Sequence, residues 1–335
     1  MLHHSLREWL DDRAAELDRS SELSHALLLK LAQANLFRIG IAPALGGSGG
    51  TLLDAIDAIS AVARHSLTAA FMFWGHRTYI DILTQAPQSA LCDRILPDLL
   101  AGQLAGATGL SNAMKFLSGL EELQIGGVAD GKGGWRLSGQ LHWVTNLQTR
   151  GFQAVTVVQP VGGGEPFIAS IGSGLAGVSR SADLALMAMQ GSATAALHFD
   201  DVALEKDGVI HSAARTFLPA VRPRFLGLQC GMALGLAECI LDECRDRLSD
   251  GHVLRGEWQT LAQRYRQIRS DLYAGVESQR FVQQPGELFR LRIGLVELAI
   301  NGIQLELMLA GGRAYLSPQG DRTARRWREC AFLPL

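Results

Sequence analysis

The chain has 335 residues, of which 47% are hydrophobic and 19% charged, and its formal net charge is −2. This length allows two or three packed units, and the composition is typical of a soluble globular protein. The near-neutral charge gives no electrostatic reason to expect nucleic acid or a membrane as a partner.

The N-terminus, MLHHSLREWLDD, has no apolar core of the kind found in signal peptides. No apolar run in the sequence approaches the length of a membrane span. We therefore expect a cytoplasmic protein.

Apolar residues recur at three- and four-residue spacing through the first hundred residues, which predicts helices over residues 6–18 and 25–37. The glycine-rich stretch 46–50 ends this pair and predicts a turn with positive φ angles. A long, mostly apolar helix is expected over residues 51–75, with Thr51 as its N-cap. Together these segments predict an N-terminal helical domain over residues 1–103.

Short segments separated by glycine-rich turns follow from about residue 104, and they predict an antiparallel β-barrel or sandwich over residues 104–212. Long segments with broad apolar faces return after that point and predict a helix bundle over residues 213–335. The expected fold class is therefore α+β, with helices before and after a central β-domain.

Residues 135–146, WRLSGQLHWVTN, resemble a strand with a turn at Ser138-Gly139. Trp143 and Thr145 are two positions apart, so on a strand they would share one face. This spacing predicts that an aromatic edge and a hydrogen-bond donor contact the same neighbouring group. The alternative is a strand buried against a neighbour in the sheet.

Four segments, in this order along the chain, are similar to motifs of the acyl-CoA dehydrogenase superfamily. They are residues 36–50, residues 139–146 with Trp143 and Thr145, residues 191–204 and residues 309–316. The resemblance covers essentially the whole chain. It implies a flavin held between the β-domain and the C-terminal bundle, with Trp143 and Thr145 beside its ring.

The resemblance also implies further cofactor contacts. Thr108 matches a family position directly, and Ser111 and Asn112 would supply substitute donors. Gly311 and Gly312 match the late helix end of the family. FAD is the expected cofactor, and FMN stays open because Met308 replaces a glutamine that serves the adenine half of FAD.

Acyl-CoA dehydrogenases remove a substrate proton with a glutamate, and the resemblance does not supply one. Arg328-Glu329-Cys330 resembles the triplet before one family position of this base, but that position is not reached within 335 residues. The other family position, early in the first C-terminal helix, corresponds to Phe225.

His76 and Tyr79 lie three residues apart on an expected helix and so project from one side. The segment resembles flavin-dependent monooxygenases of the same superfamily, which implies that both are catalytic groups facing the flavin. A histidine beside aromatic residues can equally be structural.

Three functions stay open. The first is a flavin-dependent oxidoreductase acting on an acyl-CoA-like small molecule. The second is a reduced-flavin monooxygenase, and the third is a non-catalytic member that retains the pocket. The resemblance and the apolar segments 225–240 and 291–312 predict a homodimer or homotetramer.

The remaining motifs are less specific. The five cysteines form no C-x-x-C pair, and no metal site is predicted. A basic cluster near the end is interpreted as a solvated helix face, with phosphate binding as the alternative. It consists of Arg322, Arg325, Arg326 and Arg328.

Overall fold

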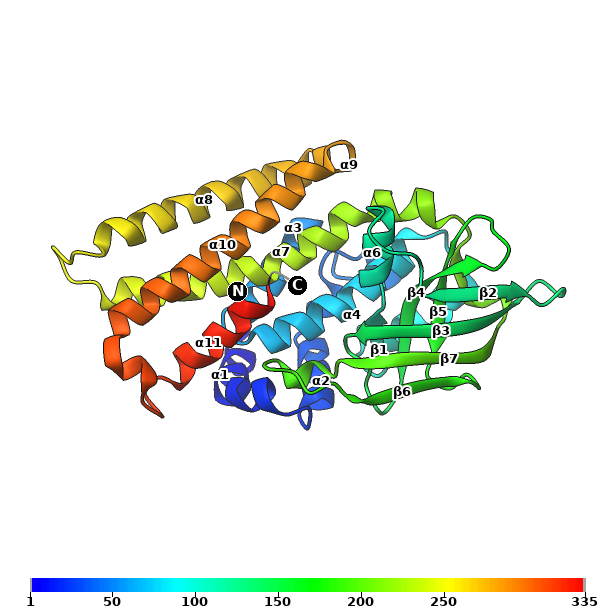
Figure 1. The fold of residues 1–335 in the computed structure, drawn as a ribbon, viewed down its shortest axis with the longest axis horizontal. Coiled ribbons are helices and arrows are strands. Elements are labelled where there is room, and N and C mark those ends of the chain that lie inside the picture. Colours follow the sequence, from blue (N-terminus) through cyan, green and yellow to red (C-terminus); the bar gives the residue numbers. More distant parts are fainter. Residues whose placement is uncertain (1, 334–335) are drawn as a thin grey trace.

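The structure is a computed structural model that describes residues 2–333. Helices form both ends of the sequence and strands form its centre, so the predicted α+β fold class is confirmed (Figure 1). The N-terminal helices are α1 (His4–Arg19), α2 (Ser24–Gln33), α3 (Leu52–Ala63), α4 (Leu67–Gln85) and α5 (Ala90–Leu100). The central elements are β1 (Ala105–Thr108), α6 (Ser111–Leu117), β2 (Ile125–Ala129), β3 (Trp135–Val144), β4 (Phe152–Pro160), β5 (Phe167–Gly172), β6 (Val178–Asp183), β7 (Ala195–Leu204) and β8 (Val209–His211). The C-terminal helices are α7 (Ala214–Arg247), α8 (Arg255–Glu277), α9 (Arg280–Gln283), α10 (Pro285–Ala310) and α11 (Asp321–Phe332).

The single helix expected over residues 51–75 is wrong, because the chain forms two helices there, α3 and α4. Thr51 caps α3 as predicted, and its side chain and that of Asp54 form a reciprocal capping box. A second cap interrupts the run, since the Ser66 hydroxyl accepts a hydrogen bond from the backbone N–H of Ala69 at 3.2 Å. After the break, α4 packs against β1 of the sheet.

The loop 46–50 has the predicted positive φ angles. Gly46, Gly49 and Gly50 have φ values of 79°, 73° and 89°. Isolated bridges pair Gly49 with Ile39 and Ile41, so the loop folds back on the segment before it. Its glycines therefore serve a tight turn.

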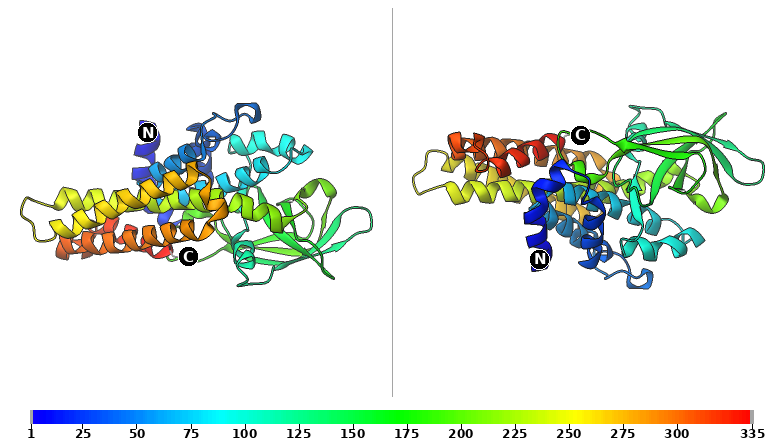
Figure 2. Two further views of the ribbon diagram at one scale, coloured as in Figure 1. Left: turned by 90° about the horizontal axis from the view of Figure 1, so that it is seen from above. Right: turned by 90° about the horizontal axis from the view of Figure 1, so that it is seen from below.

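The strands form one mixed sheet in the order β6-β7-β3-β2-β4-β5-β8, with β1 beside β4. Most pairs are antiparallel as expected, but β4 runs parallel to both β1 and β2. A period-two pattern is the same in either orientation, so the sequence did not indicate these two parallel pairs. The sheet lies at one end of the molecule and the long C-terminal helices extend from it toward the other (Figure 2).

The turn expected at Ser138-Gly139 is wrong, because β3 is continuous from Trp135 to Val144. The pairing of β3 with β7 instead shifts register between Leu137 and Gly139. Gly139 has a φ of 139°, and a Cβ atom there would lie 2.2 Å from the carbonyl oxygen of Gln124. The glycine thus allows a bulge in a strand that does not turn.

Helix α7 is the central helix of the molecule and packs directly on α3. Three glycines four residues apart face α3, namely Gly227, Gly231 and Gly235. A Cβ atom at Gly235 would lie 2.0 Å from the carbonyl oxygen of Ser60, and one at Gly231 would lie 2.8 Å from that of Ile56. The two backbones therefore touch, and no larger side chain fits between them.

Two helices have the length and apolarity of a membrane span, although the sequence predicted no such helix. In α7, 78% of the apolar window is buried inside the protein. In the most apolar stretch of the segment from Pro285 to Tyr315, which contains α10, 50% is buried. Packing in the core accounts for the apolar character of α7, whereas α10 keeps an exposed apolar face.

Three charged residues join α4, α7 and the segment before the glycine-rich loop. Asp81 accepts hydrogen bonds from Arg77 at 3.0 Å and from the fork of Arg224 at 2.6 and 2.8 Å. Arg77 is fully buried and also contacts the carbonyl oxygen of Ile39 at 3.4 Å. One carboxylate thus serves two guanidinium groups in the interior.

The arginines of α11 do not form the expected solvated face, with the exception of the exposed Arg322. Arg326 is buried and binds Glu306 of α10 with contacts of 2.5 and 3.0 Å. Arg328 pairs with Asp18 of α1. The basic cluster therefore holds α11 against α10 and α1.

Candidate functional site

Two threonines predicted to face a cofactor meet where β1 and β3 end. Thr108 and Thr145 form an isolated antiparallel bridge, and both side chains are buried. Their methyl groups lie beside Gly75 of α4, where an added Cβ atom would be 3.6 and 3.5 Å from them. The Thr145 hydroxyl accepts a long hydrogen bond of 3.5 Å from Thr194, so its own proton can be donated to another acceptor.

Trp143 lies next to this point but points outward, with 62% of its surface exposed, while Thr145 is only 6% exposed. The prediction that the two share one face of a regular strand is wrong. The reason is a second register shift between Leu141 and Val144, and β3 ends at Val144 before Thr145 is reached. A large indole thus stays exposed beside a buried hydroxyl.

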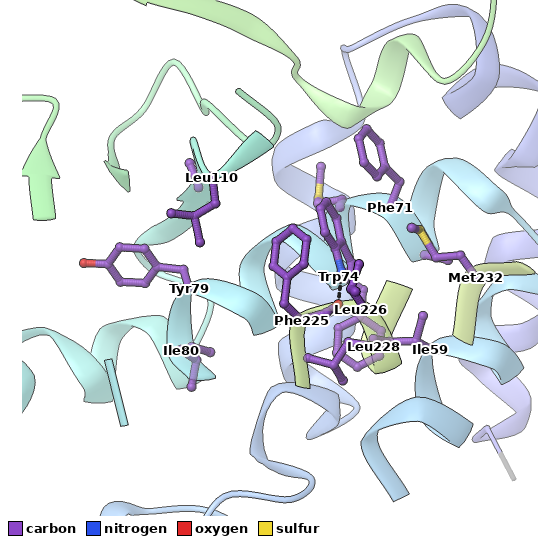
Figure 3. Close-up of a cluster of buried hydrophobic side chains, with 14 of the residues drawn as sticks. Ile59, Phe71, Trp74, Tyr79, Ile80, Leu110, Phe225, Leu226, Leu228 and Met232 are labelled. Atoms are coloured by element: carbon purple, nitrogen blue, oxygen red, sulfur yellow. Dashed lines mark hydrogen bonds between the residues drawn. The ribbon is translucent and has the colours of Figure 1, made fainter. Parts of the chain in front are cut away.

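An aromatic wall made of Phe71, Trp74, Phe225 and Phe332 adjoins these threonines through Trp74, the residue before Gly75. Figure 3 shows Phe71, Trp74 and Phe225 of this wall. Trp74 stacks on Phe71 with 5.6 Å between ring centroids and meets Phe225 edge-on at 5.1 Å. Phe71 also contacts Phe332 at 4.5 Å. The Trp74 indole donates a hydrogen bond of 3.3 Å to the carbonyl of Phe225, which fixes its orientation.

The carboxylates that lie nearest to this wall along α4 and α11 are both engaged elsewhere. Asp81 binds its two arginines, and Glu329 is buried, with its side chain accepting a hydrogen bond of 3.2 Å from the backbone of Leu67. Burial raises the pKa of Glu329, although Arg325 opposes the shift. Phe225 itself cannot ionise, so the wall has no carboxylate from these elements.

His76 and Tyr79 do project from one side of α4, as expected, but that side faces β1, β5 and the C-terminal end of α5. Both are fully buried. The ring nitrogens of His76 contact the Leu99 carbonyl and the Gly106 amide, each at 2.9 Å, and the Tyr79 hydroxyl contacts Ser170 at 2.6 Å. The structure therefore contradicts the catalytic placement, because neither group reaches an open site.

The buried position of His76 makes stability depend on pH. Burial lowers its pKa from 6.5 to about 4, although the bond to Leu99 opposes the shift. Since the folded state resists protonation, we expect about 3 kcal/mol of stability to be lost as the pH falls from 6.5 to 4. Urea denaturation at several pH values should show a shallower loss for His76→Gln. The exposed His142 gives the control. If His142→Gln reduced the acid-dependent loss of stability as much as His76→Gln does, burial of His76 would not be its cause.

Ser111 and Asn112, expected to offer donors to a cofactor, lie at the start of α6. Ser111 is exposed and accessible. Asn112 is buried, and its amide donates to Glu121 at 3.1 Å and to the Glu122 carbonyl at 2.8 Å. Its oxygen accepts from the backbone of Gln124 at 3.1 Å, so Asn112 holds a loop and has no donor left for a ligand.

Gly311 and Gly312 are exposed at the far end of α10, in the 3₁₀ segment Gly311–Tyr315. This turn lies at the opposite end of the C-terminal helices from the sheet (Figure 1). Within one chain, the structure does not bring these glycines together with Thr108, Trp143 and Thr145.

The sequence did not single out Arg222 and Arg292, two half-buried arginines that make no ion pair among residues 2–333. Arg222 has a buried Nε atom without a hydrogen-bond partner. Arg292 donates to Gln229 at 3.1 Å and to the Leu333 carbonyl at 3.2 Å. Burial lowers the pKa of both groups. Whether an arginine has an ion-pair partner depends on the folded structure, so no sequence signal would have identified these two arginines.

Two cavities lie elsewhere. One of about 700 Å³ lies between α5 and the sheet, beside Arg94, Ser170 and Asp207. The other, of about 160 Å³, lies between α1, α7 and α11 among paired charges such as Arg326 and Glu243. No cluster of metal-binding residues occurs in the described part of the chain, where four of the five free cysteines are buried.

Comparisons with known proteins identify the fold. Residues 1–103 match the family model described as the acyl-CoA dehydrogenase N-terminal domain. The structure of a probable acyl-CoA dehydrogenase from Mycobacterium abscessus superposes with a TM-score of 0.83 at 20% identity, covering 99% of this chain and 93% of that one. The chain has the acyl-CoA dehydrogenase fold.

Two further proteins share similarity with it. Mitochondrial isovaleryl-CoA dehydrogenase from Pongo abelii is 26% identical over 250 residues, which are 71% of this chain and 58% of the relative's own length. The structure described as KijD3 in complex with FMN and an amino-keto sugar nucleotide has a TM-score of 0.78 at 20% identity and covers 99% of this chain and 87% of that chain. This chain is thus similar both to a protein named as a dehydrogenase and to an FMN-binding protein that has a different name.

Proposed function

We propose that this protein is a flavin-dependent oxidoreductase whose flavin ring lies against Trp143, Thr108 and Thr145. The observation that carries the proposal is the exposed Trp143 indole beside a buried pair of hydroxyls in an acyl-CoA dehydrogenase fold. An indole of this size is normally covered, and a flat aromatic ring suits both its face and the hydroxyl donor of Thr145. A bound flavin would supply the redox chemistry, while the chain would hold the ring and shield it from water.

We propose FMN or FAD as the cofactor. The neighbouring structure with FMN supports the shorter cofactor, and Met308 at the position expected for a glutamine supports it as well. The segment after α10 that holds Gly311 and Gly312 lies at the opposite end of the molecule from β3, which carries Trp143 (Figure 1). The two glycines would therefore contribute to a flavin site only through a second copy of the chain.

The aromatic wall favours monooxygenation over acyl-CoA dehydrogenation. Acyl-CoA dehydrogenation needs a carboxylate near the substrate, and loss of such a base reduces the rate by roughly 10²–10⁴-fold. The carboxylates of Asp81 and Glu329 are engaged, and Phe225 cannot ionise. We therefore favour a reduced-flavin monooxygenase reaction on a small molecule, for which a dry aromatic wall is suitable. Its proton donor would not be His76 or Tyr79.

Replacing Trp143 with alanine is expected to weaken flavin binding roughly 10- to 100-fold, because the indole contributes area and ring contact. FAD and FMN are titrated into the apoprotein while flavin absorbance and tryptophan fluorescence are followed. Trp327→Ala, which removes a partly exposed indole from α11, should bind as the unmodified protein does. If the unmodified protein binds neither flavin below about millimolar concentration, the proposal is wrong.

Turnover assays separate the candidate reactions. Saturated acyl-CoAs with an electron-accepting dye test dehydrogenation, and chemically reduced flavin with oxygen and thioethers, phenols or amines tests oxygenation. Rapid dye reduction with saturated acyl-CoAs would contradict the proposed monooxygenase reaction. Flavin binding without turnover in either assay would indicate a non-catalytic member of the fold.

A further inference from the structure

Arg222 and Arg292 differ from three other inward-facing arginines of this chain. Arg77, Arg326 and Arg328 each bind a carboxylate inside the protein. Arg222 and Arg292 have no carboxylate within 4.0 Å in residues 2–333. A charge removed from water without a counter-charge is unfavourable, so the fold carries two positive charges that a partner would stabilise.

Arg222 lies on α7 between the sheet and the aromatic wall. The first residue of α7, Ala214, donates a hydrogen bond of 2.7 Å to the carbonyl of Pro166 at the start of β5. Arg222 follows two turns later, and Phe225, one turn further on, packs against Trp74. Arg222 therefore stands where a molecule touching both the sheet and the wall would pass.

The helical repeat places Arg292 on the same side. Gln229 is seven residues after Arg222, so both project from one face of α7 about 10 Å apart. Gln229 accepts the hydrogen bond from Arg292, which also binds the carbonyl of Leu333 next to Phe332 of the wall. Two guanidinium groups thus border the aromatic wall along one helix face.

We propose that Arg222 of α7, with Arg292 of α10 beside the same face of α7, binds the oxyanion of a molecule held between the sheet and the aromatic wall. The oxyanion is a carboxylate or a phosphate, because both match the planar fork of a guanidinium group. It belongs either to the substrate, which would then be a small acid with an apolar body, or to the flavin phosphate. The inference rests on the proposed flavin site and deepens it.

Isothermal titration with four probes tests this proposal. Benzoate presents a carboxylate on an apolar ring, inorganic phosphate presents the other oxyanion alone, and FMN and riboflavin differ only in the phosphate. We expect Arg222→Gln to weaken at least one oxyanion probe about 10- to 100-fold, as loss of a charge-assisted hydrogen bond predicts. Arg222→Lys should retain part of the affinity, since it keeps the charge but loses the fork.

The pattern of losses identifies the source of the oxyanion. Weaker benzoate binding assigns it to the substrate, whereas an FMN preference over riboflavin that disappears in Arg222→Gln assigns it to the flavin. Riboflavin carries no oxyanion, so its failure to bind would contradict the flavin site and leave the benzoate and phosphate titrations as the test of Arg222. Arg290→Gln removes an exposed arginine from α10 and should change none of the four affinities.

Thermal unfolding distinguishes binding from a structural role. Since Arg222 has no counter-charge, Arg222→Gln is expected to leave the melting temperature unchanged or to raise it. Equal binding of benzoate, phosphate and FMN by the unmodified protein and by Arg222→Gln would overturn the proposal. A large fall in melting temperature would do so as well, because it would show that Arg222 holds the fold.

Discussion

Replacing Asp81 with asparagine is expected to lower the free energy of unfolding by about 3–5 kcal/mol. Asparagine keeps the size of the side chain but removes the one negative charge within residues 2–333 that pairs with both Arg77 and Arg224. Arg77 is fully buried, so its positive charge would remain in the interior beside a second one. Urea denaturation at neutral pH measures the loss.

The pH dependence provides a second measurement for Asp81. Burial alone would raise its pKa, but hydrogen bonds and charge from Arg224 and Arg77 hold the pKa below its usual value. The stabilisation by Asp81 is therefore present above the usual carboxyl range and disappears as the pH falls through the lowered pKa. The difference in the free energy of unfolding between the unmodified protein and Asp81→Asn should therefore become smaller in strong acid.

A surface ion pair supplies the control for Asp81. Glu297 pairs with Arg264 at the surface, where both side chains are about half exposed, so Glu297→Gln should change stability by less than about 1 kcal/mol. An Asp81→Asn variant no less stable than Glu297→Gln would show that the triad does not hold α4 and α7 together.

Aspartates at Ile293 and Ile300 are expected to dissociate a homodimer or homotetramer of this chain. Both side chains lie on an exposed apolar stripe of α10, which Phe289 and Met308 continue. The spacing of 4, 7 and 8 residues between successive members places them on one face. A symmetric interface would repeat each new carboxylate, so we expect the dissociation constant to rise at least 10³-fold.

Light scattering across a micromolar concentration series measures this change. Val253→Asp alters a valine that is 90% exposed in the loop between α7 and α8, and it should leave the assembly intact. A monomeric unmodified protein at micromolar concentration would contradict the prediction of an oligomer. An assembly unaffected by both aspartates would place the interface elsewhere.

The sequence predicted the order of helices and strands because apolar periodicity reports which side of an element is buried. It did not predict the break between α3 and α4, since only a few residues separate two apolar runs and Ser66 resembles any polar helix residue. The parallel pairing of β4 was also not predictable, because strand orientation depends on distant connections.

The candidate site was predictable only in part. Thr108 and Thr145 do meet, although they are 37 positions apart, because the family resemblance conveyed a long-range contact that spacing alone does not. The spacing of His76 and Tyr79 correctly predicted a shared side of α4 but could not show that β1 and Ser170 occupy that side. Arg222 was missed because its burial depends on how α7 sits between the sheet and the wall.

The direct contact between the backbones of α3 and α7 has a consequence for the dynamics of the molecule. At Gly231 and Gly235 there is no side chain whose rotation could open a gap, so water reaches these amides only if the helices separate. Local fluctuations then cannot expose the middle of α7, and its amide hydrogens should exchange with solvent only through global opening. The aromatic wall, which Phe225 joins from the same helix, would be anchored to the most slowly exchanging segment of the chain.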